Sequence, residues 1–436
     1  MVKNEDKEGI SSIENLMDYY RLETSKDLDP LMERIGDSRY VLLGEASHGT
    51  HEYYTWRTAI SKRLIEEKGF SFIAVEGDWP DCYKINRWVK NYAEGDLKIH
   101  DVLRQFKRWP TWMWANYEIA ALAEWLREHN ANRLQESKAG FYGLDVYSLW
   151  ESMHSLVEYL QKEDPATAKL AQAAIHCFEP YREEDSYTKA LSSLEEDCRN
   201  EVIELLKEVR KKAPQYNTDP EAGLNAEINS LVAANAENYY QAMVSFNEQS
   251  WNVRDKHMVE TLNHIMKHHG PEAKVIVWEH NTHIGDARAT DMARHGLLNV
   301  GQLVRQEQNE KDVILVGFGS YQGSVMAGSD WGEAMTKMTM PPARENSVEE
   351  ILHRESPANK LLLFDKPKLK ERFSQKLRHR AIGVVYHPDR EWGNYVPTEL
   401  SKRYDAFLYI DTTNALHPIH LTPDKELVPL TYPFRF

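Results

Sequence analysis

Cysteine is scarce in this sequence. Its 436 residues include three cysteines, Cys82, Cys177 and Cys198, which are widely separated and form no CxxC pair. This spacing provides neither a disulfide framework nor a thiolate zinc site, and it fits a reducing compartment. Cys82 lies in a helix-like segment, where a lone cysteine is more often a small buried side chain than a nucleophile. We therefore expect no disulfide and no cysteine chemistry.

Long hydrophobic runs and an excess of basic residues are also missing. No apolar run approaches the roughly 18 residues of a membrane-spanning helix, and the polar start MVKNEDKEGISS does not resemble a signal peptide. The formal net charge of -15 opposes binding of nucleic acid or anionic membranes, because both need a dominant basic patch. We expect a cytoplasmic protein with a small-molecule partner, and no nucleic acid or membrane partner.

The residues that are present are typical of a folded globular protein, with 42% hydrophobic and 28% charged. The length exceeds one ordinary domain, which favours a large core with a sizeable insertion. Short apolar or β-branched runs, most of them followed by a helix-like segment, are typical of buried parallel strands. These runs cover residues 39–44, 71–75, 139–144, 274–278, 312–318, 381–386 and 406–410. The sequence therefore predicts an α/β fold with a central, mostly parallel sheet flanked by helices.

The long interval between the third and fourth runs has helical periodicity throughout. We predict that residues 1–147 form the first part of the α/β core, 148–270 a helical insertion or subdomain, and 271–436 the second part of the core. Residues 321–378 are rich in Met, Pro, Lys and Glu with weak periodicity, which predicts a loop with short helices.

Polar side chains follow four of the predicted strands. In open parallel sheets, the crevice beyond the carboxyl ends of the strands holds the active site. The residues at these four ends are Glu45 and His48, Glu76 and Asp78, Asp145, and finally Glu279, His280 and His283. Helix capping explains one or two acidic residues at such places. The convergence of carboxylates and imidazoles at four ends instead predicts a functional cleft.

Histidine acting on water is the chemistry that this cluster favours. A serine hydrolase of the α/β type needs G-x-S-x-G at a strand-to-helix turn, and the stretch GFGSYQG around Ser320 does not fit. An imidazole with a pKa near 6.5 takes a proton at neutral pH when a carboxylate orients it. His48 with Glu45 or Glu76 matches this requirement.

A divalent metal is the alternative use of the same side chains. Zinc or manganese accepts carboxylate and imidazole ligands such as Glu45, His48, Glu76, His280 and His283. The spacings of His48 to His51 and of His280 to His283 are H-x-x-H, unlike the helical pair of H-E-x-x-H, so the metal signal is weak. For His51, the sequence favours a position on a helix face or next to the metal ligands over direct ligation of a metal.

Arginines and tryptophans near these motifs are further candidates. Arg57 and Arg254 either stabilise an oxyanion or form ion pairs with Glu45 and Glu76. In FKRWPTWMWANY, Trp109, Trp112 and Trp114 predict an aromatic platform for a bulky apolar or glycosylated ligand, with a core helix start as the alternative.

Taken together, the motifs GEASHGTHEYYTWR, AVEGDWPD, WPTWMW, VRDKHM and WEHNTHIGD resemble the erythromycin esterase family. The resemblance extends from about residue 30 to about residue 410. It implies an α/β core with a deep cleft in which a histidine activates water to open a macrolide lactone. It also implies no covalent intermediate, no obligatory metal and no other cofactor.

The resemblance also implies roles for single residues. His48 matches the general base, and Glu45 matches the acidic residue of the same motif. The other matching charged positions are Arg57, Glu76, Arg254 and the second histidine region, where both His280 and His283 are candidates and His280 is slightly favoured. Apart from the resemblance, Asp145 at its strand end and the three tryptophans of the aromatic segment are expected to bind substrate. A metal-dependent hydrolase or phosphoesterase and a non-catalytic binder of an apolar natural product are the alternative functions.

Overall fold

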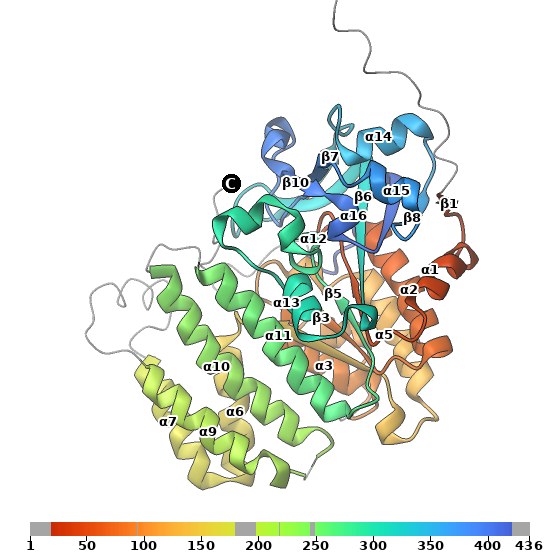
Figure 1. Ribbon diagram of the computed structural model, residues 1–436. Helices are drawn as coiled ribbons and strands as arrows, with labels where there is room; N and C mark the ends of the chain where they lie inside the picture. Colours follow the sequence, from red (N-terminus) through yellow and green to blue (C-terminus); the bar gives the residue numbers. More distant parts are fainter. Residues whose placement is uncertain (1–18, 94, 179–197, 218, 245–248, 421–436) are drawn as a thin grey trace, which may run out of the picture.

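The central element of the computed structural model, which describes residues 19–93, 95–178, 198–217, 219–244 and 249–420, is a β-sheet. Within these residues it has nine strands in the order β1-β8-β11-β6-β2-β5-β3-β4, with β7 paired to β6 (Figure 1). Their bounds are Tyr20–Arg21 (β1), Tyr40–Leu43 (β2), Phe72–Asp78 (β3), Gly140–Asp145 (β4), Val275–Trp278 (β5), Val313–Gly328 (β6), Met335–Met340 (β7), Lys360–Leu363 (β8) and Ala406–Thr413 (β11).

The pairing of these strands confirms the predicted α/β fold. The six strands from β11 to β4 in this order pair in parallel, and antiparallel pairing occurs between β8 and β11, β1 and β8, and β7 and β6. Strand β2 lies in the middle, with Leu43 opposite both Trp278 of β5 and Val316 of β6. The turn that follows β2 therefore opens at the centre of the sheet edge.

Helices cover both faces of the sheet, which explains why the strands are apolar along their whole length. Val41 and Leu43 belong to the core that includes α1 (Asp29–Ile35), α2 (His51–Lys68) and α5 (Tyr117–Asn130). Tyr40 and Leu42 belong to the core that includes α11 (Gln249–His269) and α13 (Val300–Glu307). Shorter helices complete the layers: α3 (Trp79–Val89), α4 (Ile99–Leu103), α12 (Asn281–Ile284), α14 (Val348–Glu355), α15 (Pro367–Arg372) and α16 (Leu400–Arg403).

A separate group of helices lies beside the sheet, at the lower left of Figure 1. It consists of α6 (Leu149–Glu163), α7 (Pro165–Phe178), α9 (Arg199–Lys212) and α10 (Ala222–Val244). These helices share an apolar cluster of their own, with Leu156, Val202 and Tyr239 among its buried members. They fall within the predicted helical insertion, whose boundaries at 147/148 and 270/271 stay predictions.

The absence of a disulfide was a wrong prediction. Cys177, near the end of α7, is bonded to Cys198, which directly precedes α9. Helices α7 and α9 pack against each other, and this packing brings together two cysteines that are 21 residues apart in sequence. Cys82 is buried and free. Its thiol has a pKa raised well above the usual value by burial, followed by the charge of Asp81.

The second half of the chain also differs from the prediction. Residues 381–386 form no strand. Ile382 and Val385 make isolated bridges to Ser47 and Gly328, and the apolar side chains of this segment pack on the β6–β7 hairpin and on the sheet core. Strand β6 is longer than predicted, because its far half pairs with β7 as a hairpin. The predicted loop region 321–378 contains β7, α14, β8 and α15. A two-stranded sheet of β9 (Lys376–Arg380) and β10 (Tyr395–Glu399) follows it.

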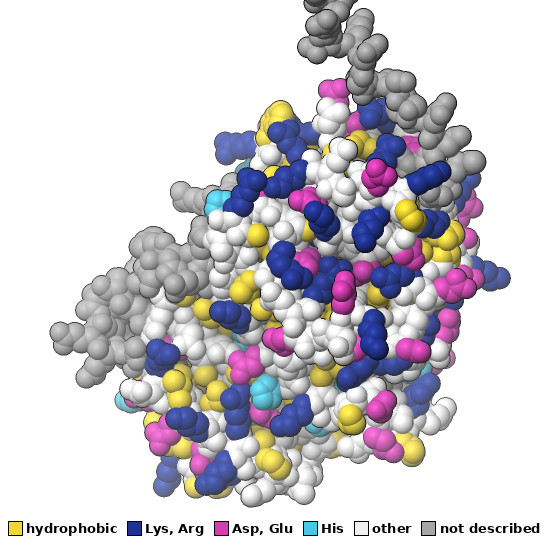
Figure 2. Space-filling model, in the orientation of Figure 1, with side chains coloured by type: hydrophobic (Ala, Val, Ile, Leu, Met, Phe, Trp, Pro, Cys, Tyr) yellow, Lys and Arg dark blue, Asp and Glu magenta, His cyan; other side chains and the backbone are white. Residues whose placement is uncertain are grey.

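The surface carries charges of both signs. Figure 2 shows Lys and Arg side chains interspersed with Asp and Glu over the face in view. Among the described residues, no helix is both long enough and apolar enough to cross a membrane.

Candidate active site

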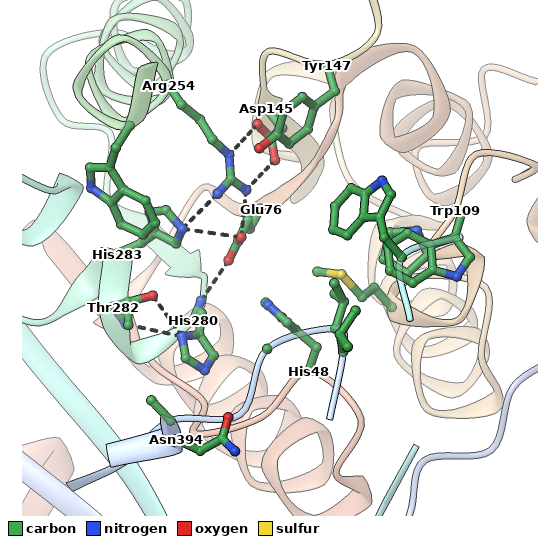
Figure 3. A pocket seen from close by; sticks show the side chains of 18 of the residues that line it. His48, Glu76, Trp109, Asp145, Tyr147, Arg254, His280, Thr282, His283 and Asn394 are labelled. Carbon is green, nitrogen blue, oxygen red and sulfur yellow. Dashed lines mark hydrogen bonds and ion pairs between the residues drawn. The ribbon is translucent and has the colours of Figure 1, made fainter. Parts of the chain in front are cut away.

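A cavity of about 1050 Å³ lies at the carboxyl ends of the central strands. Its wall includes His48 after β2, Glu76 near the end of β3, Asp145 at the end of β4, and His280 and His283 after β5 (Figure 3). The topology therefore brings the four predicted strand ends together. Glu45 and Arg57 do not line the cavity; they lie behind His48.

His48 is held by a buried carboxylate. Its Nδ1 is 2.8 Å from Glu45 Oε1, and Glu45 Oε2 accepts a hydrogen bond of 2.6 Å from Arg57 Nη2. Because an ionised carboxylate only accepts, Nδ1 of neutral His48 carries the proton and donates it to Glu45. This tautomer leaves Nε2 as the nitrogen with a lone pair for a proton from water.

Arg57 is fully buried under this pair. Its guanidinium lies 4.5 Å from the ring centre of Tyr54 and 4.6 Å from that of Trp278. These aromatic contacts and the ion pair fix the far side of Glu45. Arg57 thus acts on the cavity through Glu45, as the ion-pair alternative from the sequence proposed.

Burial and neighbouring charges have opposite effects on the pKa of His48. Burial lowers the pKa, but the charge of Glu76 and the hydrogen bond that His48 donates to Glu45 together outweigh it and raise the pKa above 6.5. The imidazole of His48 is therefore a better proton acceptor than a histidine in water.

A second network centres on Arg254 of α11 (Figure 3). Its Nε and Nη2 donate to the two carboxylate oxygens of Asp145 at 2.9 and 2.7 Å, and Nη2 also donates to Glu76 Oε1 at 2.6 Å. Burial alone raises the pKa of Glu76, but the charge of its partner Arg254 and the hydrogen bond from the His280 backbone contribute to lowering it overall. Glu76 is therefore an anion that faces His48.

His283 is saturated by its neighbours. Arg254 Nη1 lies 2.9 Å from His283 Nε2, and His283 Nδ1 lies 3.0 Å from both oxygens of Asp255. Arginine only donates, so Nε2 accepts and Nδ1 donates to Asp255. The ring also stacks on Trp251 with 4.5 Å between centres. Both ring nitrogens of His283 are therefore hydrogen-bonded to protein side chains, which suits a residue that positions Arg254.

His280 differs from His283 in this respect. Its Nδ1 accepts a hydrogen bond from the backbone N–H of Thr282 at 3.3 Å, so the proton of the neutral ring is on Nε2. Nε2 is buried and has no close hydrogen-bond partner among the described residues. Burial lowers the pKa of His280 well below 6.5, and the nearby His48, whose ring centre is 4.9 Å away, lowers it further, although the Ala46 backbone acts on the ring and raises its pKa in part. His280 is thus a neutral donor beside His48.

The backbone of His280 is tied to the Arg254 network. Glu76 Oε2 accepts a hydrogen bond of 2.8 Å from the His280 backbone N–H. Asn281 Nδ2 donates to the Phe318 carbonyl of β6 at 2.7 Å, which fixes the next residue to the sheet. Arg254 therefore orients His280 through Glu76.

The three predicted tryptophans are placed differently. Trp109 and Trp114 line the cavity, whereas Trp112 is fully buried in the core and does not line it. The expected substrate contact of Trp112 therefore has no geometric basis, because the short helical turn Thr111–Met113 points this ring inward to the core. Trp114 Nε1 donates to the Glu76 carbonyl at 2.9 Å.

The described chain matches the family model named Erythromycin esterase over residues 65–413. The chain belongs to the erythromycin esterase family. Erythromycin esterase type II of Escherichia coli is 24% identical, with 90% of this chain and 94% of that protein aligned. The putative hydrolase YbfO of Bacillus subtilis is 22% identical, with 92% and 87% aligned. Membership supports a hydrolase of this type with a small-molecule substrate.

Solved structures have the same fold. A Bacillus cereus protein has a TM-score of 0.76 at 20% identity, with 93% of this chain and 97% of that one covered. A succinoglycan biosynthesis protein has a TM-score of 0.71 at 20% identity, with 92% and 96% covered. A mutant of the erythromycin esterase EreC in an open conformation has a TM-score of 0.66 at 16% identity, with 90% and 95% covered.

Several residues that line or support the cavity of this family member were not predicted from the sequence. Tyr147, Trp251 and Trp331 contribute aromatic wall, and Asp255 holds His283 from behind. Trp251 and Asp255 could have been predicted from the sequence, because they lie three residues before and one residue after Arg254 on the same predicted helix. Trp331 had no such signal, since it comes from the segment after β6.

Proposed function

We propose that the protein hydrolyses a carboxylic ester or lactone with a water activated by His48, and forms no covalent intermediate. The observation that carries the proposal is the buried His48–Glu45–Arg57 chain, whose free end, His48 Nε2, belongs to a cavity-lining residue. A histidine with a fixed tautomer and a raised pKa is suited to general base catalysis.

The proposed reaction has two steps. His48 Nε2 takes a proton from water while the water oxygen attacks the carbonyl carbon, and the resulting oxyanion accepts a hydrogen bond from His280 Nε2–H. Protonated His48 then returns the proton to the leaving alkoxide as the carbon–oxygen bond breaks. One water is consumed, and the products are a carboxylic acid and an alcohol.

Arg57, Glu76 and Arg254 act as positioning residues in this proposal. Arg57 orients Glu45, and Arg254 with Asp145 holds Glu76 against the His280 backbone. The pairing of both carboxylates with arginine favours this use over metal ligation, because each negative charge already has its cation.

A bulky apolar substrate, with a macrolide as the first candidate, fits the cavity best. The volume of about 1050 Å³ is at the upper end for drug-sized ligands, and the wall includes Trp109, Trp114, Trp251 and Trp331. The relative named erythromycin esterase type II supports the same substrate class.

Mass spectrometry of erythromycin, other macrolides and simple esters tests the proposal. The wild-type protein should convert its substrate to a product heavier by one water, both before and after treatment with a chelator. The rate of this reaction should fall at least about 100-fold in His48→Asn. His154→Asn, a change at an exposed histidine outside the cavity, is the matched control. Full activity of His48→Asn would refute the assigned base, and loss of activity on chelation with an unchanged thermal midpoint would favour a metal-dependent hydrolase.

A further inference from the structure

Three metal-ligand side chains meet outside the cavity. They are His51, the first residue of α2, Glu118 in the first turn of α5, and His417 in the segment after β11. Nδ1 of His51 and Nδ1 of His417 lie 2.5 and 2.6 Å from the same oxygen, Oε1 of Glu118. One ligand atom of each side chain lies within 4.8 Å of the others.

Backbone hydrogen bonds hold these three positions together. The His51 N–H donates to the Asn414 carbonyl at 2.9 Å, and the Leu416 N–H donates to the Gly49 carbonyl at 2.9 Å. The Tyr117 N–H donates to the His417 carbonyl at 3.0 Å. The segment around His417 is therefore fixed across the starts of both helices, and the donor groups are pre-organised.

The exposure of the three side chains leaves one side of the cluster open. Glu118 is 4% exposed, His51 is 34% and His417 is 62% exposed. The buried carboxylate forms the floor, and both imidazoles face it from the solvent side. Water molecules can complete a coordination shell there.

We propose that His51, Glu118 and His417 bind a divalent first-row transition-metal ion, with zinc as the representative. Two neutral imidazoles and one carboxylate are ligands that zinc takes at about 2.0–2.2 Å, and their net charge of -1 attracts a dication. When the ion binds, each Nδ1 becomes a ligand and the ring proton is on Nε2.

Such an ion fastens the C-terminal segment to the turn that carries His48. His51 is three residues after His48, and Leu416 is bonded to Gly49 within that turn. The ion is therefore structural: it has no ligand from the cavity wall and stabilises the turn from behind.

Calorimetric titration of chelator-treated, tag-free protein with zinc chloride tests the site. We expect one equivalent of zinc to bind the wild type and to raise its thermal midpoint. His417→Ala should weaken zinc binding at least tenfold and abolish the rise in midpoint. Glu118→Gln should act in the same way, and His154→Ala, which removes an exposed histidine elsewhere, should change neither quantity.

The site must also be distinguished from the cavity. His48→Asn removes a candidate ligand of the cavity cluster and is expected to leave zinc binding intact. Zinc binding that His48→Asn abolishes and His417→Ala retains would overturn the proposal, and so would absence of binding to the wild type. Because His417 is exposed and lies outside the core, its replacement leaves the fold available for the measurement.

Discussion

The proposed role of His48 as the general base predicts how activity depends on pH. The general base must be neutral to accept a proton, so kcat/KM should rise with pH as His48 loses its proton. Since Glu76 and Glu45 outweigh burial and raise the pKa of His48, the acid limb should lie above pH 6.5. A pH profile of kcat/KM with the best ester substrate measures this limb.

Glu45→Gln provides the matched variant for this prediction. Removal of the charged hydrogen-bond partner should move the acid limb to lower pH and reduce kcat/KM. Circular dichroism checks that the variant is folded. A limb that stays in place in Glu45→Gln would contradict the role of Glu45, whereas Glu136→Gln, at an exposed site, should leave the profile unchanged.

Arg57 should contribute to stability as well as to the proposed catalysis. Replacement by alanine leaves the buried carboxylate of Glu45 without its cation, and such a change costs about 3–5 kcal/mol. We expect Arg57→Ala to lower the free energy of unfolding by about this amount in a denaturant titration. Arg354→Ala breaks an exposed pair with Glu350 and should cost less than about 1 kcal/mol. Equal losses in the two variants would contradict this account.

The turn between β2 and α2 has no space for a side chain at Gly49. A Cβ atom there would lie 1.8 Å from the backbone oxygen of Met326 in β6, and backbone cannot move aside as a side chain can. Gly49→Ala should therefore destabilise the fold by about 1–3 kcal/mol or more and displace His48 from Glu45.

Thermal unfolding and kcat measure the two effects of Gly49→Ala. Gly393→Ala is the control, because its Cβ would meet no atom within 4 Å. An unchanged thermal midpoint in Gly49→Ala would show that β6 yields to the added methyl group.

The elements around this turn were the most predictable part of the fold. Buried parallel strands are short apolar runs, and Tyr40–Leu43, Phe72–Asp78 and Val275–Trp278 follow this pattern closely. Strand β7 was missed because its burial is confined to its two ends, Met335 and Met340, with exposed threonines and lysine between. Its pairing depends on the distant β6, which local sequence does not reveal.

The polar residues at the strand ends of the candidate site were predictable from the sequence, whereas most of its aromatic wall and its geometry were not. The predicted parallel orientation of the strands alone placed His48, Glu76 and Asp145 at one edge, since the residues after parallel strands share that edge. The distinction between His280 and His283 required hydrogen-bond partners: Arg254 and Asp255 occupy both nitrogens of His283. The disulfide likewise required the packing of α7 on α9.

The cavity depends on contacts between the helical group and the sheet. Arg108 joins the two, because it pairs with Asp78 at the end of β3 at 3.1 Å and with Glu151 of α6 at 2.8 Å. The helical group nevertheless has an apolar core of its own, and α10 also contributes Leu224 and Ile228 to one of the two cores that cover the sheet. Its stability can therefore change while the sheet and the His48 turn stay folded.

The bond between Cys177 and Cys198 should stabilise this helical group selectively. A disulfide that closes a loop with a sequence separation of 21 residues raises the free energy of the unfolded chain by about 3 kcal/mol, because it lowers the chain's conformational entropy. The double variant Cys177→Ser/Cys198→Ser should exchange amide hydrogens faster in α7 and α9, with β2 and β5 unchanged. Hydrogen exchange under non-reducing conditions measures these rates. A reductant should raise the exchange rates of the wild type in α7 and α9 to those of the variant, and it should not change the rates of the variant. Faster exchange throughout the sheet would instead mean that the helices and the sheet unfold as one unit.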